Sequence, residues 1–182
     1  MTSPPTAPQL RWQGKYISAW QQGTWEYVSR SRGIRAAVIL ALDEEGKDSP
    51  CLILVEQYRV PLGRNCLELP AGLVGDDDSS ASEAASEAAI RELEEETGYR
   101  ARLMTDLGDF YSSPGMVSES FSLFRASGLT RIHEGGGVEG ENIIVHRVPV
   151  AGIKDYVAQR RAEGIAIDVK LLLALGAEML AG

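Results

Sequence analysis

The sequence predicts an α/β chain in which a few helices interrupt and follow mainly β segments. Its 182 residues suit one domain with a small appendage, at about 100–200 residues per domain. Short apolar and β-branched runs predict the strands, and three longer stretches carry helix-forming residues. The two kinds of segment do not alternate regularly, which argues against a doubly wound parallel sheet.

The first half of the chain reads as a tail followed by strands. Residues 1–10 are rich in Pro, Thr and Ser and predict a loose tail. Aromatic and β-branched residues at 15–20 and 24–30 flank a short Gln-Gln-Gly turn, which predicts a hairpin. Residues 35–42 and 51–58 are almost continuously apolar, so we expect two buried strands there.

A helix is predicted next, over residues 83–97, with Gly98 in the position of a C-terminal glycine. An apolar stripe of Ala85, Ala89, Ile90 and Leu93 at helical spacing predicts its core-facing side. Strands are expected again at 102–111, 120–126 and 143–148, and helices at 150–162 and 168–180.

Composition excludes several functional classes. The formal net charge is −8 with no basic stripe, which makes nucleic acid a poor partner. The longest apolar run, at 36–42, is far shorter than the roughly 20 residues that cross a bilayer. The first residues lack a secretory pattern, so a cytoplasmic location is expected. Cys51 and Cys66 show no metal-binding spacing and predict reduced, packed thiols.

Acidic residues are concentrated around the predicted helix. Residues 68–96 hold a net charge of −9, which leaves +1 for the rest of the chain. Glu92 and Glu96 are four residues apart on one helix face, and Glu95 lies on the neighbouring row. Carboxylates in the last turns repel each other and oppose the helix dipole. A solvated acidic face is one interpretation; a bound Mg²⁺ would resolve the conflict, because hard cations take oxygen ligands.

The same residues resemble the Nudix box, Gly-x5-Glu-x7-Arg-Glu-U-x-Glu-Glu-x-Gly-U, where U is bulky and apolar. From Glu83 through Arg91-Glu92-Leu93-Glu94-Glu95-Glu96-Thr97-Gly98-Tyr99 the match is complete. Gly72 stands eleven positions before Glu83, where the pattern has six, so an acidic, Ser-rich insertion lies between them. Glu83 also fits a capping box with Ser80. The resemblance implies a Nudix fold, a mixed β-sheet sandwiched between α-helices.

The resemblance also implies roles for individual residues. Metal ligands would be Glu92, Glu96 and the carbonyl of Ala71, with Mg²⁺ as the ion and Mn²⁺ able to substitute for it. Arg91 would hold the glutamates, and Glu95 would be a further ligand or a supporting carboxylate. In the acidic loop after Gly135-Gly136-Gly137, Glu139 resembles a general base and Glu141 a further ligand, although the two roles could be exchanged. The three glycines suggest a mobile segment able to close over a site.

Flanking motifs narrow the resemblance to ADP-ribose pyrophosphatases. The matching residues are Gln57-Tyr58-Arg59, Glu68-Leu69-Pro70-Ala71-Gly72 and Ser113-Pro114-Gly115, with Pro114 sixteen positions after Gly98. By this likeness Arg59 would contact substrate phosphate, and Pro114 and Glu119 would lie near the substrate. Strand aromatics usually pack, yet Trp25 is the best candidate for stacking on adenine.

The predicted activity is Mg²⁺-dependent hydrolysis of the pyrophosphate bond of ADP-ribose or a related nucleoside diphosphosugar. Alternatives are another sugar nucleotide, such as GDP-mannose, and a nucleotide-sensing Nudix domain without catalysis. Residues 1–33 are expected to form a separate region that mediates a homodimer, because they carry many aromatics, and residues 34–182 the hydrolase domain. A calcium loop from Asp76 to Glu87 is a weaker interpretation, since Ala81 stands where it needs glycine.

Overall fold

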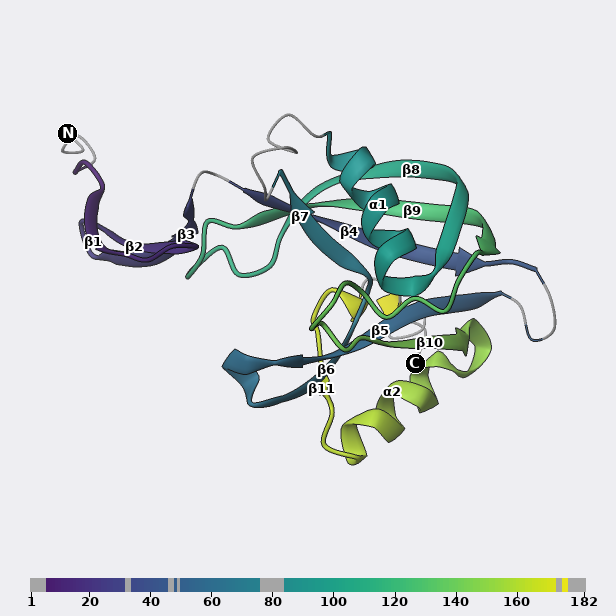
Figure 1. Cartoon of the computed structure of the whole chain (residues 1–182). Coiled ribbons are helices and arrows are strands. Elements are labelled where there is room, and N and C mark those ends of the chain that lie inside the picture. Colours follow the sequence, from purple (N-terminus) through teal and green to yellow (C-terminus); the bar gives the residue numbers. More distant parts are fainter. Residues whose placement is uncertain are drawn as a thin grey trace.

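The computed structural model describes residues 6–31, 34–45, 48, 50–75, 84–172 and 175–176. Three antiparallel strands form a small sheet that projects from the body of the molecule (Figure 1): β1 (Gln9–Gln13), β2 (Ile17–Gln22) and β3 (Trp25–Arg30). The predicted hairpin corresponds to β2 and β3. The predicted tail is too long, because its last residues alternate polar and apolar side chains and pair with β2.

The large sheet has eight strands and mixed directions. Its central strand, β4 (Arg35–Asp43), is parallel to β9 (Ser120–Arg131), which pairs with the edge strand β8 (Tyr99–Tyr111). The remaining strands are β5 (Cys51–Arg59), β6 (Arg64–Glu68), β7 (Ala71–Val74), β10 (Ile144–Pro149) and β11 (Ala166–Ile167). Of these, β6, β7 and β11 were not predicted as strands.

The sheet divides beside β4. Residues 35–38 of β4 pair with β7, whereas residues 41–43 pair with the beginning of β5. Further along, β5 pairs with β6 instead, across residues 55–59. The strands β4 and β5 are therefore paired at one end and diverge at the other, where β4 pairs with β7 and β5 pairs with β6. Side chains line the space between the two diverging pairs.

Helix α1 (Ala85–Thr97) covers one face of the sheet. Ala88, Ala89 and Leu93 are fully buried in a cluster with residues of β4, β8 and β9. The expected position of Ile90 in the core is wrong: 42% of this residue is exposed. It lies about 100° around the helix from Ala89, while Ala88 completes the buried face in its place.

The ends of α1 are set by its flanking residues. The Glu87 carboxylate accepts the Ala84 N–H at 3.2 Å, and Gly98 ends the helix with a φ of 74°. The expected capping box with Glu83 at N3 is wrong, because the helix begins at Ala85 and Glu87 is its N3 residue. Ser80, Glu83 and the acidic insertion lie outside the described residues, so the calcium-loop interpretation stays a prediction.

Helix α2 (Ile153–Ala162) covers the opposite face, after a 3₁₀ turn, η3 (Val150–Gly152). Ile153 and Val157 join Leu171 and Leu175 in a second core cluster. Between them, β11 lies just before the expected last helix, residues 169–170 form a turn where that helix was expected to begin, and helical residues are described at 171–172 and 175–176. The expected mixed sheet between helices is confirmed.

Two smaller expectations concern cysteines and membranes. Cys51 and Cys66 are buried free thiols, as predicted, and burial raises the pKa of Cys66 to about 12. Among the described residues, no helix is long and apolar enough to cross a membrane.

Candidate active site

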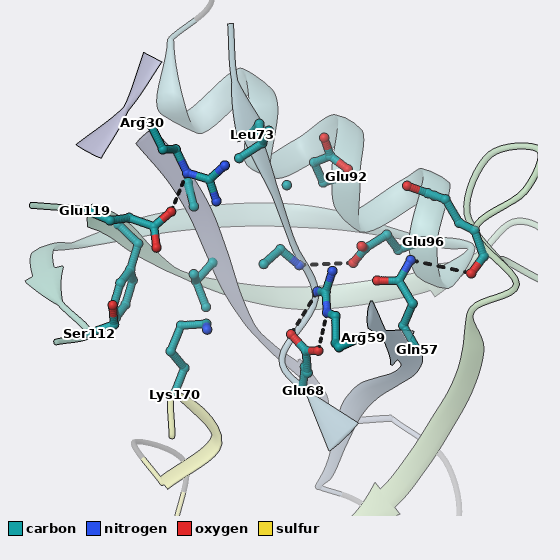
Figure 2. Close-up of a pocket in the computed structure, with 16 residues that line it drawn as sticks. Arg30, Gln57, Arg59, Glu68, Leu73, Glu92, Glu96, Ser112, Glu119 and Lys170 are labelled. Carbon is teal, nitrogen blue, oxygen red and sulfur yellow. Dashed lines mark hydrogen bonds and ion pairs between the residues drawn. The ribbon is translucent and has the colours of Figure 1, made fainter. Parts of the chain in front are cut away.

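A cavity of about 400 Å³ opens where the two strand pairs separate. Its wall comes from β3 to β7, from α1, from β9 and the loops on either side of it, and from the C-terminal segment (Figure 2). The ionisable residues that line it are Arg30, Arg59, Glu68, Glu92, Glu96, Glu119, Glu141 and Lys170. The predicted metal ligands Ala71, Glu92, Glu96 and Glu141 thus share one cavity, although they come from three separate parts of the chain.

Glu96 is the most deeply placed carboxylate of the wall that α1 contributes. Only 6% of the residue is exposed, and its Oε2 accepts the backbone N–H of Ala71 at 3.0 Å. Burial raises the pKa of Glu96 to about 8, and the nearby charges of Glu92 and Glu141 add to the rise. The Ala71 N–H and the charge of Arg59 lower the pKa of Glu96 but do not offset its burial, so an added positive ion would favour the ionised form.

Glu92 lies one turn earlier on α1, against β7. A Cβ atom on Gly72 would overlap the Glu92 carboxyl group, so this position of β7 accepts only glycine while Glu92 keeps its place. Burial also raises the pKa of Glu92. Arg91 partly offsets that effect, because its Nη1 donates to Glu92 at 2.8 Å and to Glu95 at 3.3 Å.

Arg91 also ties the helix to the sheet, since its Nη2 donates to the Leu73 carbonyl at 3.4 Å. Its bonds to Glu92 and Glu95 agree with the role of holding the glutamates, which the resemblance implies for Arg91. Arg91 and Glu95 stand beside the cavity wall and do not line it.

The acidic loop brings Glu141 to the cavity and leaves Glu139 exposed. Glu141 accepts the Val138 N–H through its own Oε2 at 2.9 Å, and its backbone carbonyl accepts a bond from Gln57 at 3.4 Å. The negative charge of Glu141 adds to the rise in the pKa of both Glu92 and Glu96, which shows that the three carboxylates lie near one another.

These carboxylates do not form a closed cluster. Among the described residues, no three Asp, Glu, His or Cys side chains converge closely enough to hold a metal ion as they stand. The donor set nevertheless fits a hard divalent cation, because it consists of carboxylates and the one most buried has a strongly raised pKa.

Cationic residues line the cavity beside and opposite the α1 carboxylates (Figure 2). Arg59 makes two parallel bonds to Glu68, at 2.6 and 2.9 Å, and Arg30 pairs with Glu119. Lys170 bonds to Asp168 at 2.7 Å, which leaves further ammonium donors for a ligand. Sequence reasoning identified Arg59 and Glu119 but missed Arg30 and Lys170, because only the fold brings these two residues to the same cavity.

Two predicted substrate residues lie away from the cavity wall. Trp25 is 63% exposed on the small sheet, and Pro114 lies in the loop before β9. That loop is bonded to β3, because Val28 donates to the Met116 carbonyl at 3.0 Å and accepts from Ser118 at 3.0 Å. These bonds hold the small sheet beside the cavity, where Arg30 of β3 pairs with Glu119 of the loop.

Comparison with known proteins identifies the family and the fold. A family model for the NUDIX domain matches residues 32–163, so the chain belongs to the Nudix family of hydrolases. The family and the fold expected from the Nudix box are confirmed. A crystal structure of an ADP compounds hydrolase superposes with a TM-score of 0.65 at 24% identity, over 87% of this chain and 85% of that one.

The relatives of this chain include pyrophosphatases that act on different sugar nucleotides. An ADP-ribose pyrophosphatase of Bacillus subtilis is 40% identical over 99 residues, which are 54% of this chain and 49% of that enzyme. The aligned part is therefore about half of that enzyme's length. A GDP-mannose pyrophosphatase of Cronobacter sakazakii is 35% identical over 153 residues, which are 79% of this chain and 72% of that enzyme.

Proposed function

We propose that this chain hydrolyses the pyrophosphate bond of a nucleoside diphosphosugar in a Mg²⁺-dependent reaction. ADP-ribose is the favoured substrate, with AMP and ribose 5-phosphate as products. The observation that carries the proposal is the buried carboxyl of Glu96, near Glu92 and Glu141, in the wall of a cavity that also contains Arg59. Such a cavity suits a negatively charged substrate that arrives with, or meets, a divalent cation.

Glu92, Glu96, Glu141 and the carbonyl of Ala71 would hold Mg²⁺, and Mn²⁺ can take its place. The bound ion would neutralise diphosphate charge and lower the pKa of a coordinated water. Gly72 contributes by leaving room for the Glu92 carboxyl group. Arg91 contributes by binding Glu92 and Glu95 together on α1.

Hydrolysis requires a base that accepts a proton from the water attacking phosphorus, while the bond to the bridging oxygen breaks. Glu139 is the proposed base, because it lies two residues from Glu141 in an exposed loop beside the cavity. Glu95 is the second candidate for this role. Its carboxylate accepts a bond from Nη1 of Arg91 at 3.3 Å.

Arg59, Arg30 and Lys170 are proposed to bind the substrate's phosphates and sugar, with Glu119 accepting hydroxyl donors. Trp25 and Pro114 would act in a homodimer, where a second copy of the small sheet completes the adenine site. Exposed aromatic and apolar residues of that sheet and of the turn before β2 support the presence of a covering partner: Leu10, Trp12, Tyr16, Ile17 and Trp25. Light scattering at micromolar concentration would give the mass of a dimer; the mass of a monomer would reject this part. The proposed location is the cytoplasm.

GDP-mannose is the second candidate substrate, since the GDP-mannose pyrophosphatase aligns over more of this chain than the ADP-ribose enzyme does. A panel of nucleoside diphosphosugars, incubated with Mg²⁺ and analysed for both products, tests the proposal. ADP-ribose should give the highest kcat/KM, and EDTA should abolish the reaction. Preference for GDP-mannose would reassign the substrate, and cleavage of no member would favour a sensing domain that binds without catalysis.

A further inference from the structure

The loop that carries Glu141 is bonded to the C-terminal end of α1. The Gly136 N–H donates to the Glu96 carbonyl at 2.8 Å, and the Gly137 N–H donates to the Glu95 carbonyl at 3.1 Å. The Gly98 carbonyl accepts the Ile132 N–H at 2.8 Å. The last carbonyls of a helix have no partner within the helix, so these bonds satisfy acceptors that would otherwise need water. Loop and helix end form one bonded unit.

This contact depends on the absence of a side chain at Gly135. A Cβ atom there would lie 2.5 Å from the Thr97 carbonyl carbon and 2.7 Å from the Glu96 oxygen. Both are backbone atoms of α1 and its end, so neither can rotate away. Gly135 also has a φ of 74°, in the left-handed region that glycine adopts at little cost. The glycines therefore permit a close backbone approach, a role different from the mobility that the sequence suggested.

Gly137 has a separate relationship with the Glu141 side chain. A Cβ atom on Gly137 would overlap Oε2 of Glu141 and lie 2.9 Å from Cδ1 of Ile143. The same Oε2 accepts the Val138 N–H at 2.9 Å. The carboxyl group of Glu141 is thus held over Gly137, in the space that a larger residue would fill.

We propose that Gly135 and Gly137 are positioning residues that fix Glu141 relative to Glu92 and Glu96. Gly135 does so by allowing the loop backbone to meet α1, and Gly137 by leaving space for the Glu141 carboxyl group. The inference rests on the proposed function, because it takes Glu141 to be a ligand of the metal. It assigns these glycines to the metal site although neither one lines the cavity.

Mn²⁺ binding to the metal-stripped full chain, followed by electron paramagnetic resonance without substrate, tests the proposal. Gly135→Ala should weaken Mn²⁺ affinity about tenfold or more, the size typical of losing a group that orients a ligand. Glu141→Gln should weaken it at least as much. The double variant should bind no more weakly than Glu141→Gln, because both changes remove the same ligand. Additive losses would show that Gly135 acts by another route and would overturn the proposal.

Gly164→Ala is the matched control. Gly164 follows α2 and has a φ of 88°, so alanine there is strained too, but its Cβ would meet nothing within 4 Å and the residue does not line the cavity. Its Mn²⁺ affinity should stay within about twofold of the parent, which is the usual scatter for uncoupled sites. An equal loss in Gly164→Ala and Gly135→Ala would mean that backbone strain is responsible, and the positioning role would be wrong.

Gly137→Ala decides the question if Gly135→Ala fails to fold. Its Cβ would meet the ends of two side chains, which can move, so the fold should persist while Glu141 is displaced. If Gly137→Ala binds Mn²⁺ as tightly as the parent while Glu141→Gln binds it weakly, this inference is overturned and the proposed function is not. Parent-like affinity in Glu141→Gln would instead remove Glu141 from the proposed ligands, which is a failure of the proposed function.

Discussion

Gly72 and Glu92 occupy adjoining space so closely that a single methyl group on Gly72 would coincide with the carboxyl group of Glu92. Gly72 is a residue of β7 with an ordinary backbone conformation, and it pairs with Ala37 of β4. The glycine is therefore required by the carboxylate and not by the strand. Its place eleven residues before Glu83 shows that the longer acidic insertion leaves the contact between β7 and α1 in place.

The first prediction concerns Gly72→Ala. The variant should fold, because alanine suits a strand and restricts the unfolded chain, an effect worth about 0.4–1 kcal/mol. The displaced Glu92 should raise the Mg²⁺ concentration that gives half-maximal rate by about tenfold or more. Gly152→Ala, where nothing lies within 4 Å of the added carbon, is the control. An unchanged Mg²⁺ requirement in Gly72→Ala would separate Glu92 from metal binding.

The second prediction concerns the stability of the metal-free protein. The folded pKa of Glu96, about 8, lies above its ordinary value of 4.5. Between these values the folded state holds a proton that the unfolded state has lost, so stability falls as pH rises through this range. Glu96→Gln should lack this contribution, and in EDTA its melting temperature should exceed that of the parent increasingly from pH 5 to pH 8.

Differential scanning calorimetry in EDTA provides the measurement, with each kcal/mol worth about 2–4 °C for a chain of this size. The difference between the melting temperatures of the parent and the variant is compared across pH, because His146 also contributes to the pH dependence of both proteins. Burial lowers the pKa of His146, so its contribution to stability rises with pH, opposite to that of Glu96. A difference that does not change with pH would show that the Glu96 carboxyl is not perturbed by its surroundings.

The third prediction separates Glu139 from Glu141. Glu139→Gln should lower kcat by about 10²–10⁴, the range for a general base, with little change in the Mg²⁺ requirement. Glu141→Gln should raise the Mg²⁺ requirement, and excess metal should restore part of the rate, because this residue lines the cavity and Glu139 does not. Steady-state kinetics at several Mg²⁺ concentrations gives both quantities. If both variants keep kcat within a few-fold at saturating Mg²⁺, the base must be sought at Glu95 or Glu119.

The fourth prediction concerns Lys170. Its ammonium group lines the cavity, so Lys170→Met should raise KM for ADP-ribose by about tenfold or more, as expected for a hydrogen bond to a charged group. Lys154→Met on the exposed side of α2 is the matched control and should leave KM unchanged. If Lys170→Met binds substrate as well as the control does, the C-terminal segment has no part in substrate recognition.

Much of the fold could be predicted from sequence, for identifiable reasons. The apolar runs of β4 and β5 and the glutamate-rich helix ending at Gly98 carry strong local signals, and the structure has these elements within a few residues of the expected ends. In contrast, β7 has four residues and β11 has two, and both owe their extended form to pairing with distant strands. Their local sequence holds too little pattern to reveal them.

The site shows the same division between local and long-range information. Glu92, Glu96 and Arg91 lie within one motif and could be identified from it. Arg30 and Lys170 stand 140 residues apart in sequence, and each is an unremarkable basic residue until the fold brings both to the cavity. The role of Gly135 could not be predicted either, because it depends on which backbone atoms of α1 the loop meets.

The central claim is that the buried carboxylates of α1 hold the metal ion on which hydrolysis depends. Turnover of ADP-ribose by Glu96→Gln at saturating Mg²⁺ tests it most directly, because the substitution preserves shape and removes one ligand charge. We predict that kcat falls by more than about 100-fold, beyond the loss typical of residues that merely orient a ligand, while circular dichroism shows an intact fold. A folded Glu96→Gln variant that turns over ADP-ribose at nearly the parental rate would contradict the claim.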